Sequence, residues 1–291
     1  MNPVIRPVLK VVSAHRQEEG AGFVVRRPFP SAGLSVADPF LMLDELGPVD
    51  YAPGQAIGAP DHPHRGFETV SYILEGEVEH EDSAGHRGII GAGDVQWMTA
   101  GRGVIHSEMP TRQILEKGGR VHGFQIWVNL PARDKMMAPR YQEVPKAKIP
   151  EGKSVRARVK VVAGSALGVD AAIDTRTPIA LHDWTLDPGA LEDVTIPTSY
   201  SVYVYVFSGT ALVDGQSVVE GQLAVLGRGD IVRLGTDEAE KKAARLLLLA
   251  GEPIREPVVS YGPFVMNTKA EILQAVSDYQ NGKMGEIART T

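Results

Sequence analysis

A block of sequence occurs twice in the chain, and this repeat limits the possible folds more than any other feature. Tyr72-Ile-Leu-Glu-Gly76 aligns with Tyr205-Val-Phe-Ser-Gly209 at an offset of 133 residues, and Gly93-Asp94 through Gly101 aligns with Gly221-Gln222 through Gly229 at an offset of 128. Each copy has the order strand, glycine turn, strand, loop and further strand, which is typical of a small jelly-roll barrel. We therefore expect two barrels in tandem, the second with a hairpin loop five residues shorter.

Short runs rich in valine, isoleucine, tyrosine and phenylalanine fill much of the chain, and 31 glycines and 20 prolines separate them. This punctuation favours an all-β protein of many short strands, and 291 residues are enough for two domains. We expect the first barrel in residues 1–130, a proline-rich connector in 131–158 and the second barrel in 159–291. Helical spacing occurs only near the end, where Thr268 and Glu271 have the spacing of a capping box, so a short C-terminal α-helix is expected.

Composition argues against several classes of function. The formal net charge of −6 provides no basic field for a phosphate backbone, so direct binding of nucleic acid is not expected. Without cysteine, the chain has no disulfides, thiolate metal ligands or cysteine nucleophiles. No run of 18 apolar residues predicts a membrane span, and residues 1–10 lack the apolar core of a signal peptide. We expect a cytoplasmic protein.

Two short segments carry a candidate metal site, Asp61-His-Pro-His64 and His106-Ser-Glu108. Residues two apart in a strand face the same side, about 7 Å apart along the chain. His62 and His64 can therefore converge on one point, and the same holds for His106 and Glu108. If the two strands are neighbours, three imidazoles and one carboxylate meet, a ligand set that suits Fe, Ni, Cu, Mn or Zn.

Glu68 is a further candidate at this site. It keeps the alternation of His62 and His64, so we expect it to face inward as a fifth ligand or as a partner of a ligand.

Other histidines are assigned structural positions. His80 and His86, with Glu81, resemble a metalloprotease motif only in composition, because their spacing does not place two ligands on one helix face. A solvated hairpin loop is the expected location for them. The remaining histidines are assigned to the surface or the core: His15, His122 and His182.

The second copy of the repeat lacks the ligands. Its two offsets place Thr195, Pro197, Leu234 and Thr236 at the positions of the four candidate ligands. None of these side chains replaces an imidazole, so we expect the second barrel to bind no metal.

Two longer segments resemble the pirin family of the cupin superfamily. They are His62-Pro-His-Arg-Gly-Phe-Glu-Thr-Val-Ser-Tyr-Ile-Leu-Glu-Gly76 and Gly93-Asp-Val-Gln-Trp-Met-Thr-Ala-Gly-Arg-Gly-Val-Ile-His-Ser-Glu-Met-Pro110. Supporting similarity lies in residues 38–45, 122–130 and 256–267, so the resemblance spans nearly the whole chain. It implies a bicupin whose N-terminal barrel holds one metal, usually iron, through His62, His64, His106 and Glu108. It also implies a C-terminal barrel without ligands.

The resemblance implies two different functions. Similar proteins open the flavonol quercetin with dioxygen, which would make this chain a quercetin 2,3-dioxygenase. In that case a metal acts as Lewis acid on the substrate hydroxyl, and Glu108, or Glu68 beside it, accepts the hydroxyl proton. Apolar walls for the flat substrate would come from Phe67, Trp97, Met98 and Trp127. The alternative is a non-enzymatic regulator, similar to animal members of the family, whose metal redox state controls binding to a protein partner.

Overall fold

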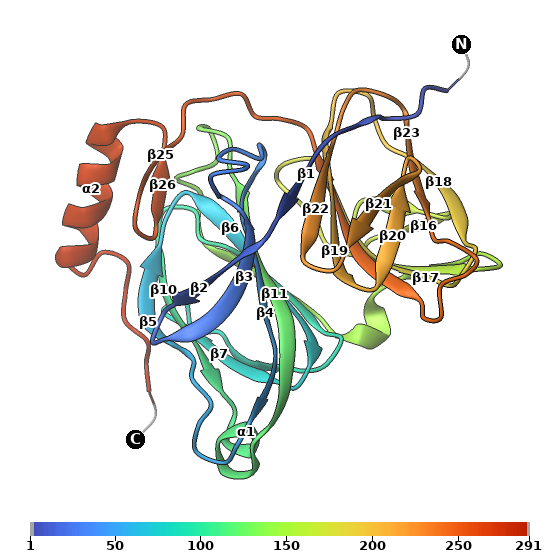
Figure 1. Cartoon of the computed structure of the whole chain (residues 1–291). Helices are drawn as coiled ribbons and strands as arrows, with labels where there is room; N and C mark the ends of the chain where they lie inside the picture. Colours follow the sequence, from blue (N-terminus) through green and yellow to red (C-terminus); the bar gives the residue numbers. More distant parts are fainter. Residues whose placement is uncertain (1–2, 290–291) are drawn as a thin grey trace. The chain divides into compact units, whose positions relative to one another are not determined.

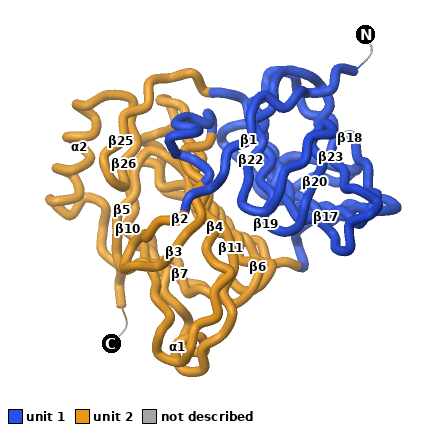
Figure 2. Tube along the Cα trace, in the orientation of Figure 1, with its two compact units in different colours: residues 1–15, 28–39, 147–253 blue, residues 16–27, 40–146, 254–291 orange. Residues whose placement is uncertain are grey.

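The computed structural model describes residues 3–289, which divide into two compact units (Figures 1 and 2). Unit 1 contains residues 1–15, 28–39 and 147–253, and unit 2 contains residues 16–27, 40–146 and 254–291. These units differ from the linear boundaries 1–130, 131–158 and 159–291. The reason is long-range pairing, because strand β1 (Val8–Ser13) pairs with β22 (Gln222–Leu226) of unit 1, and residues 254–291 return to unit 2.

Unit 2 is built on one seven-stranded and one four-stranded antiparallel sheet. The larger sheet has the order β12 (Arg140–Val144), β9 (Val95–Thr99), β6 (Phe67–Glu75), β11 (Gly119–Asn129), β4 (Phe40–Tyr51), β3 (Phe23–Phe29) and β2 (His15–Glu19). The smaller sheet has the order β5 (Ala59–His64), β10 (Val104–Pro110), β7 (Val78–Asp82) and β8 (Arg87–Ile90). A two-stranded ribbon of β25 (Val259–Tyr261) and β26 (Phe264–Met266) completes this unit.

Unit 1 repeats the same pair of sheet sizes. Its seven strands are, in order, β1, β22, β19 (Ser201–Ser208), β24 (Ala244–Gly251), β17 (Ile179–Leu186), β14 (Ala157–Ala163) and β13 (Glu151–Lys153). Its four strands are β18 (Leu191–Thr195), β23 (Ile231–Gly235), β20 (Thr210–Val213) and β21 (Gln216–Val219). Short additional elements are β15 (Ser165–Ala166), β16 (Val169–Asp170) and the 3₁₀ turn η1 (Lys146–Lys148). Two units with matching sheets confirm the all-β fold expected from the repeat.

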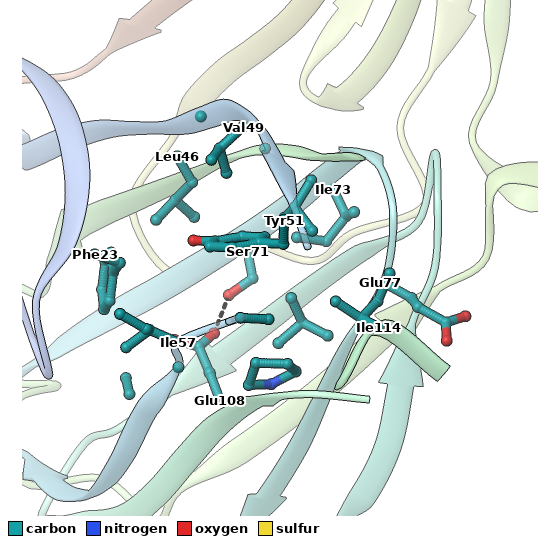
Figure 3. A pocket seen from close by; sticks show the side chains of 18 of the residues that line it. Phe23, Leu46, Val49, Tyr51, Ile57, Ser71, Ile73, Glu77, Glu108 and Ile114 are labelled. Carbon is teal, nitrogen blue, oxygen red and sulfur yellow. Dashed lines mark hydrogen bonds between the residues drawn. The ribbon is translucent and has the colours of Figure 1, made fainter. Parts of the chain in front are cut away.

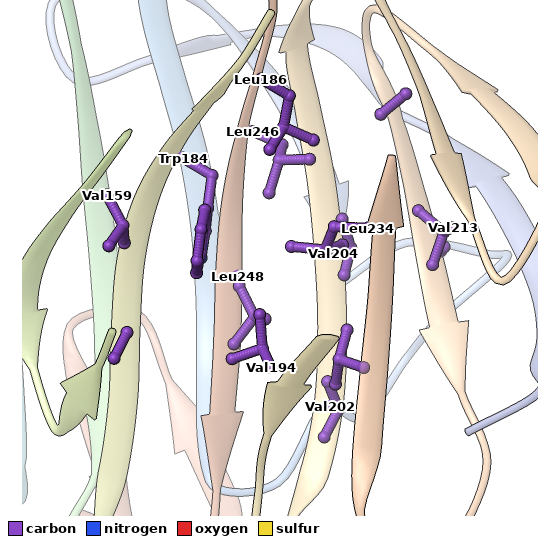
Figure 4. Packing of buried hydrophobic residues seen from close by; sticks show 14 of the residues in the cluster. Val159, Trp184, Leu186, Val194, Val202, Val204, Val213, Leu234, Leu246 and Leu248 are labelled. Atoms are coloured by element: carbon purple, nitrogen blue, oxygen red, sulfur yellow. The ribbon is translucent and has the colours of Figure 1, made fainter. Parts of the chain in front are cut away.

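A continuous apolar cluster fills unit 1 (Figure 4). On β19 its members are Val202, Val204 and Val206, which alternate as expected for one face of a strand. Trp184 of β17 and Leu248 of β24 belong to the same cluster, and both are fully buried. Burial of this apolar surface stabilises the unit.

The offset of the repeat fails within β18. It assigns Thr195 and Pro197 to two ligand positions, but both are exposed, whereas Val194 and Ile196 belong to the buried cluster. A shift of one residue moves a strand side chain to the opposite face. On β23 the assigned residue Leu234 does lie in the cluster. The inward-facing side chains of the pair formed by β18 and β23 are therefore apolar.

Two α-helices are present in the described residues, both in unit 2. The predicted C-terminal helix is confirmed as α2 (Lys269–Gln280), and its capping box between Thr268 and Glu271 is formed in both directions. The other helix, α1 (Arg112–Lys117), was not predicted; it is short, and the side chain of Thr111 caps its N-terminus. Among the described residues, neither helix has the length and apolarity needed to cross a membrane.

Candidate metal centre

Three of the predicted ligands meet in unit 2, where β5 and β10 are neighbours. The Cα of His62 lies opposite that of His106, and His64 lies opposite Val104. One ligand atom of each histidine lies within 4.8 Å of those of the other two. The ring centroid of His106 is 4.3 Å from that of His62 and 4.8 Å from that of His64. The two strand motifs thus bring His62, His64 and His106 together as the sequence analysis expected.

Two of these rings have their Nδ1 atoms occupied. Nδ1 of His62 donates to the carbonyl oxygen of Pro60 at 2.7 Å, and Nδ1 of His64 donates to that of Pro263 at 3.4 Å. A carbonyl only accepts, so in a neutral ring Nε2 keeps a lone pair. The two Nε2 atoms nevertheless lie 3.1 Å apart. Two acceptors at this distance repel each other unless a cation or a proton lies between them.

The third ring is fully buried. His106 has no exposed surface, and its Nε2 has no hydrogen-bond partner within residues 3–289. Burial, and then the charges of His64 and His62, lower the pKa of His106 well below its ordinary value. Burial and the charge of His62 likewise lower the pKa of His64. Both rings are therefore neutral near pH 7, which is the form that binds a metal, and the site fits a divalent metal.

Glu108, the fourth predicted ligand, lies beside the histidine cluster on β10 without joining it. Its Oε1 accepts a hydrogen bond from Oγ of Ser71 at 2.5 Å (Figure 3). Its Oε2 accepts one from Nε2 of Gln125 at 2.8 Å. The side chain is only partly buried. Its metal ligation stays a prediction.

The carboxylate of Glu108 lines a pocket in the same unit (Figure 3). Most of the lining is apolar and comes from β3, β4, β6 and the segment before β5, including Phe23, Leu46, Val49, Ile57 and Ile73. Polar groups are few, and Ser71, Tyr51 and Glu77 supply most of them. An apolar pocket with few polar groups is suited to an aromatic ligand with a small number of hydroxyls.

Glu68 does not face the cluster, and the expectation that it points inward was wrong. Phe67 contacts His64, with ring centroids 5.0 Å apart, so the next residue of β6 faces the opposite side. The carboxylate of Glu68 accepts a hydrogen bond from Oγ1 of Thr99 at 2.6 Å and is completely buried. The turn at Gly66, where φ is +91°, resets the alternation between β5 and β6.

Two of the four expected apolar walls contact the histidines. Trp127 lies 5.3 Å from His64 and 4.4 Å from Phe67 between ring centroids. Trp97 is paired with Val70, which faces away from the side of Phe67 because the two residues are an odd number of positions apart on β6. Trp97 therefore faces the other side of the sheet. Met98 is paired with Thr69 and so shares the face of Phe67.

His80 is not part of a solvated loop. It lies on β7 with no exposed surface, and only His86, whose side chain is 41% exposed, matches that expectation. His80 and Asp82 are two residues apart, as in the two ligand segments, but this spacing alone does not identify the strand that β7 pairs with.

The C-terminal segment of unit 2 supports the strand that carries His64. Next to this histidine, Nη1 of Arg65 forms a buried ion pair with Asp278 of α2 at 2.9 Å. Lys135, 1% exposed, donates to the carbonyl oxygens of Gly66 and Val265 and to Oδ1 of Asn129. Burial lowers the pKa of Lys135 to about 8, so it stays largely charged at pH 7.

Comparisons with known proteins identify the family. The family description Pirin matches residues 22–128, and the Pirin C-terminal cupin domain matches residues 181–285, which confirms the bicupin fold. The human protein Pirin is 45% identical over 285 residues, covering 96% of this chain and 94% of that protein. Pirin-like protein 2 of Arabidopsis thaliana is 44% identical over 298 residues, covering 98% of this chain and 88% of that protein.

A solved structure is similar along the whole chain. The crystal structure of quercetin 2,3-dioxygenase from Acinetobacter baumannii has a TM-score of 0.90 and 36% sequence identity, covering 98% of this chain and all of that one. Since both family descriptions match in order and close relatives align nearly end to end, the chain belongs to the pirin family.

Proposed function

We propose that this protein is a metal-dependent dioxygenase that opens the heterocycle of a flavonol such as quercetin. The observation that carries the proposal is the convergence of His62, His64 and His106 with two Nε2 lone pairs 3.1 Å apart and the third Nε2 buried without a partner. A structural relative at 36% identity is a quercetin 2,3-dioxygenase.

The three histidines would hold one divalent metal, with Glu108 as a fourth ligand. Iron is the expected metal, and Ni, Cu, Mn and Zn also suit nitrogen and oxygen donors. When bound, such a metal supplies Lewis acidity toward the 3-hydroxyl oxygen of the substrate.

Glu108 is our candidate for the general base. It lies two residues from His106 on the same face of β10, about 7 Å along the strand. Ser71 and Gln125 hold both of its oxygens at the pocket wall, where the carboxylate can accept the hydroxyl proton of a flavonol. Glu68, the other candidate, is held by Thr99 on the opposite face of β6, so the geometry favours Glu108.

The pocket beside Glu108 is the proposed location of the aromatic rings. Its aliphatic and aromatic walls exclude water from a flat ligand. Outside this lining, the half-buried Trp127 packs next to His64, and the fully buried Phe67 packs against both rings. The overall reaction needs no external reductant. Both atoms of dioxygen enter the cleaved product, and carbon 3 of the flavonol leaves as carbon monoxide.

The test is oxygen uptake and carbon monoxide release with quercetin, measured on protein loaded with each candidate metal and on metal-free protein. We expect turnover only in loaded protein, with carbon monoxide matching the oxygen consumed. Metal-replete protein that consumes no oxygen would contradict the proposal and would favour the regulatory alternative, in which the metal's redox state controls a protein partner.

A further inference from the structure

His80 is a buried histidine for which the proposed reaction has no role. On β7 its Cα lies opposite that of Glu108, and the Cα of Asp82 lies opposite that of His106. Directly opposite residues of an antiparallel pair share one face. His80 and Asp82 therefore face the same side as the histidine cluster, and both are buried, with 0% and 3% exposed surface.

Asp82 fixes the protons on the ring of His80. Its Oδ1 accepts the backbone N–H groups of Ala84 and His86 at 2.9 and 3.0 Å, which holds the carboxylate in place. Its Oδ2 lies 3.4 Å from Nε2 of His80. An ionised carboxylate only accepts, so Nε2 of His80 carries the proton and Nδ1 keeps a lone pair. Nε2 of Gln96 donates to that Nδ1 at 2.9 Å.

The same lone pair of His80 faces His106. The two Nδ1 atoms are 3.5 Å apart, and the ring centroids are 5.3 Å apart. Gln96 and His106 share the single lone pair on Nδ1 of His80. An acceptor at this place favours the proton on Nδ1 of His106, which leaves Nε2 of His106 with a lone pair. That Nε2 is the buried atom without a partner.

We propose that Asp82 and His80 act as positioning residues that hold His106 in the tautomer whose Nε2 is free to bind a metal. The proposal rests on the proposed metal centre and adds the groups that orient one of its ligands. His62 and His64 use backbone carbonyls for the same purpose. Among the three, His106 alone has an Nδ1 contact to a side chain in the described structure, so its orientation can be tested by substitution.

The first test measures zinc affinity by competition with a chromophoric chelator. His80→Phe keeps an aromatic ring and removes the acceptor, and should weaken zinc binding about 10- to 100-fold, as loss of an outer partner of a metal ligand does. His80→Asn places an amide oxygen near the Nδ1 position and should recover part of this loss. His86→Gln is the matched control, because His86 contacts Asp82 but not His106, and it should bind like wild type. Wild-type affinity in His80→Phe would overturn the proposal.

The second test observes the tautomer of His106 directly in metal-free protein. Long-range ¹H–¹⁵N spectra of histidine-labelled protein, assigned with His106→Gln, should show the proton on Nδ1 in wild type and a mixture of tautomers in His80→Phe. A proton on Nε2 of His106 in the wild-type protein would overturn the proposal. This measurement distinguishes failure of the proposed metal centre from failure of the proposed role of His80. Wild-type protein that binds no zinc would contradict the metal centre, whereas the tautomer of His106 tests the role of His80 in either case.

Asp82→Asn provides a variant that keeps the hairpin intact. It retains Oδ1 for the backbone N–H groups of Ala84 and His86 and replaces Oδ2, which faces Nε2 of His80 at 3.4 Å and Nδ1 of His86 at 2.9 Å. The new amide N–H favours a proton on Nδ1 of His80, which would deprive His106 of its acceptor. We expect weaker zinc binding and a larger share of His106 with its proton on Nε2. If neither the zinc affinity nor the tautomer of His106 changes, Asp82 has no part in positioning His106.

Discussion

The Nε2 atoms of His62 and His64 lie 3.1 Å apart, although each ring already donates its Nδ1 proton to a backbone carbonyl. In two neutral rings the Nε2 lone pairs repel each other at this distance, and a cation or a proton between them removes the repulsion. This relationship makes the metal centre testable without any assumption about the reaction.

We predict one divalent metal per chain, lost in a His64→Ala, His106→Ala double variant, because each ligand contributes to one shared site. Elemental analysis of purified protein measures the stoichiometry. His15→Ala is the control, since that histidine is exposed on β2 and should leave the metal content unchanged. Stoichiometric metal in the double variant would contradict the assignment.

Glu108→Gln should keep most of the metal and lower quercetin turnover about 10²- to 10⁴-fold, the usual cost of removing a positioned general base. The amide preserves the shape of the side chain but cannot accept the hydroxyl proton. Glu68→Gln is the matched comparison and should keep most of its turnover, because Glu68 faces the other side of β6. Oxygen uptake is measured for both variants at equal metal content. A larger loss of turnover in Glu68→Gln than in Glu108→Gln would assign the base to Glu68.

Lys135→Met should lower the free energy of unfolding of unit 2 by about 2–4 kcal/mol, because three buried acceptors lose their donor. Urea unfolding measures the loss, and limited proteolysis should show earlier cleavage within residues 254–291. The exposed Lys269→Met serves as control and should change stability by no more than about 0.5 kcal/mol. Equal stability of the two variants would show that Lys135 is dispensable.

His182 should make unit 1 less stable in mild acid. It is fully buried on β17, and neither ring nitrogen has a hydrogen-bond partner in the described part of the chain. Burial lowers the pKa of His182 to about 4. Between pH 6.5 and about 4 the unfolded chain binds a proton that the folded chain does not, so stability falls as pH falls. From pH 7.5 to 5 the expected loss is about 2 kcal/mol.

This loss should be absent in His182→Leu. In a Trp97→Phe, Trp127→Phe background, Trp184 is the single tryptophan and reports on unit 1 during urea unfolding. An identical pH dependence with and without His182 would show that its ring is not the cause.

The sequence predicts those parts of the fold and site that depend on strict alternation within one strand. His62, His64 and His106 could be predicted to meet because each ligand segment lies on one strand. Glu68 could not be placed, because the turn at Gly66 lies between it and His64 and resets the alternation.

Features that depend on pairing between distant segments were also beyond the sequence. The repeat predicts two barrels, but its offset aligns the exposed Thr195 with a ligand position, whereas the neighbouring residues are the buried ones. An error of one residue moves a side chain to the opposite face of the strand. The burial of His80 follows from the pairing of β7 with β10, and two residues of a hairpin do not reveal that partner.

The exchange of segments between the two units bears on how the protein is made. β22 is synthesised more than 200 residues after its partner β1, and the carbonyl of Pro263 is made about 200 residues after His64, which it contacts. Neither unit can therefore be completed during translation of a single contiguous stretch (Figure 2). The proposed metal ligands are synthesised before Pro263, so the proposed site can reach its final geometry only after Pro263 has been made.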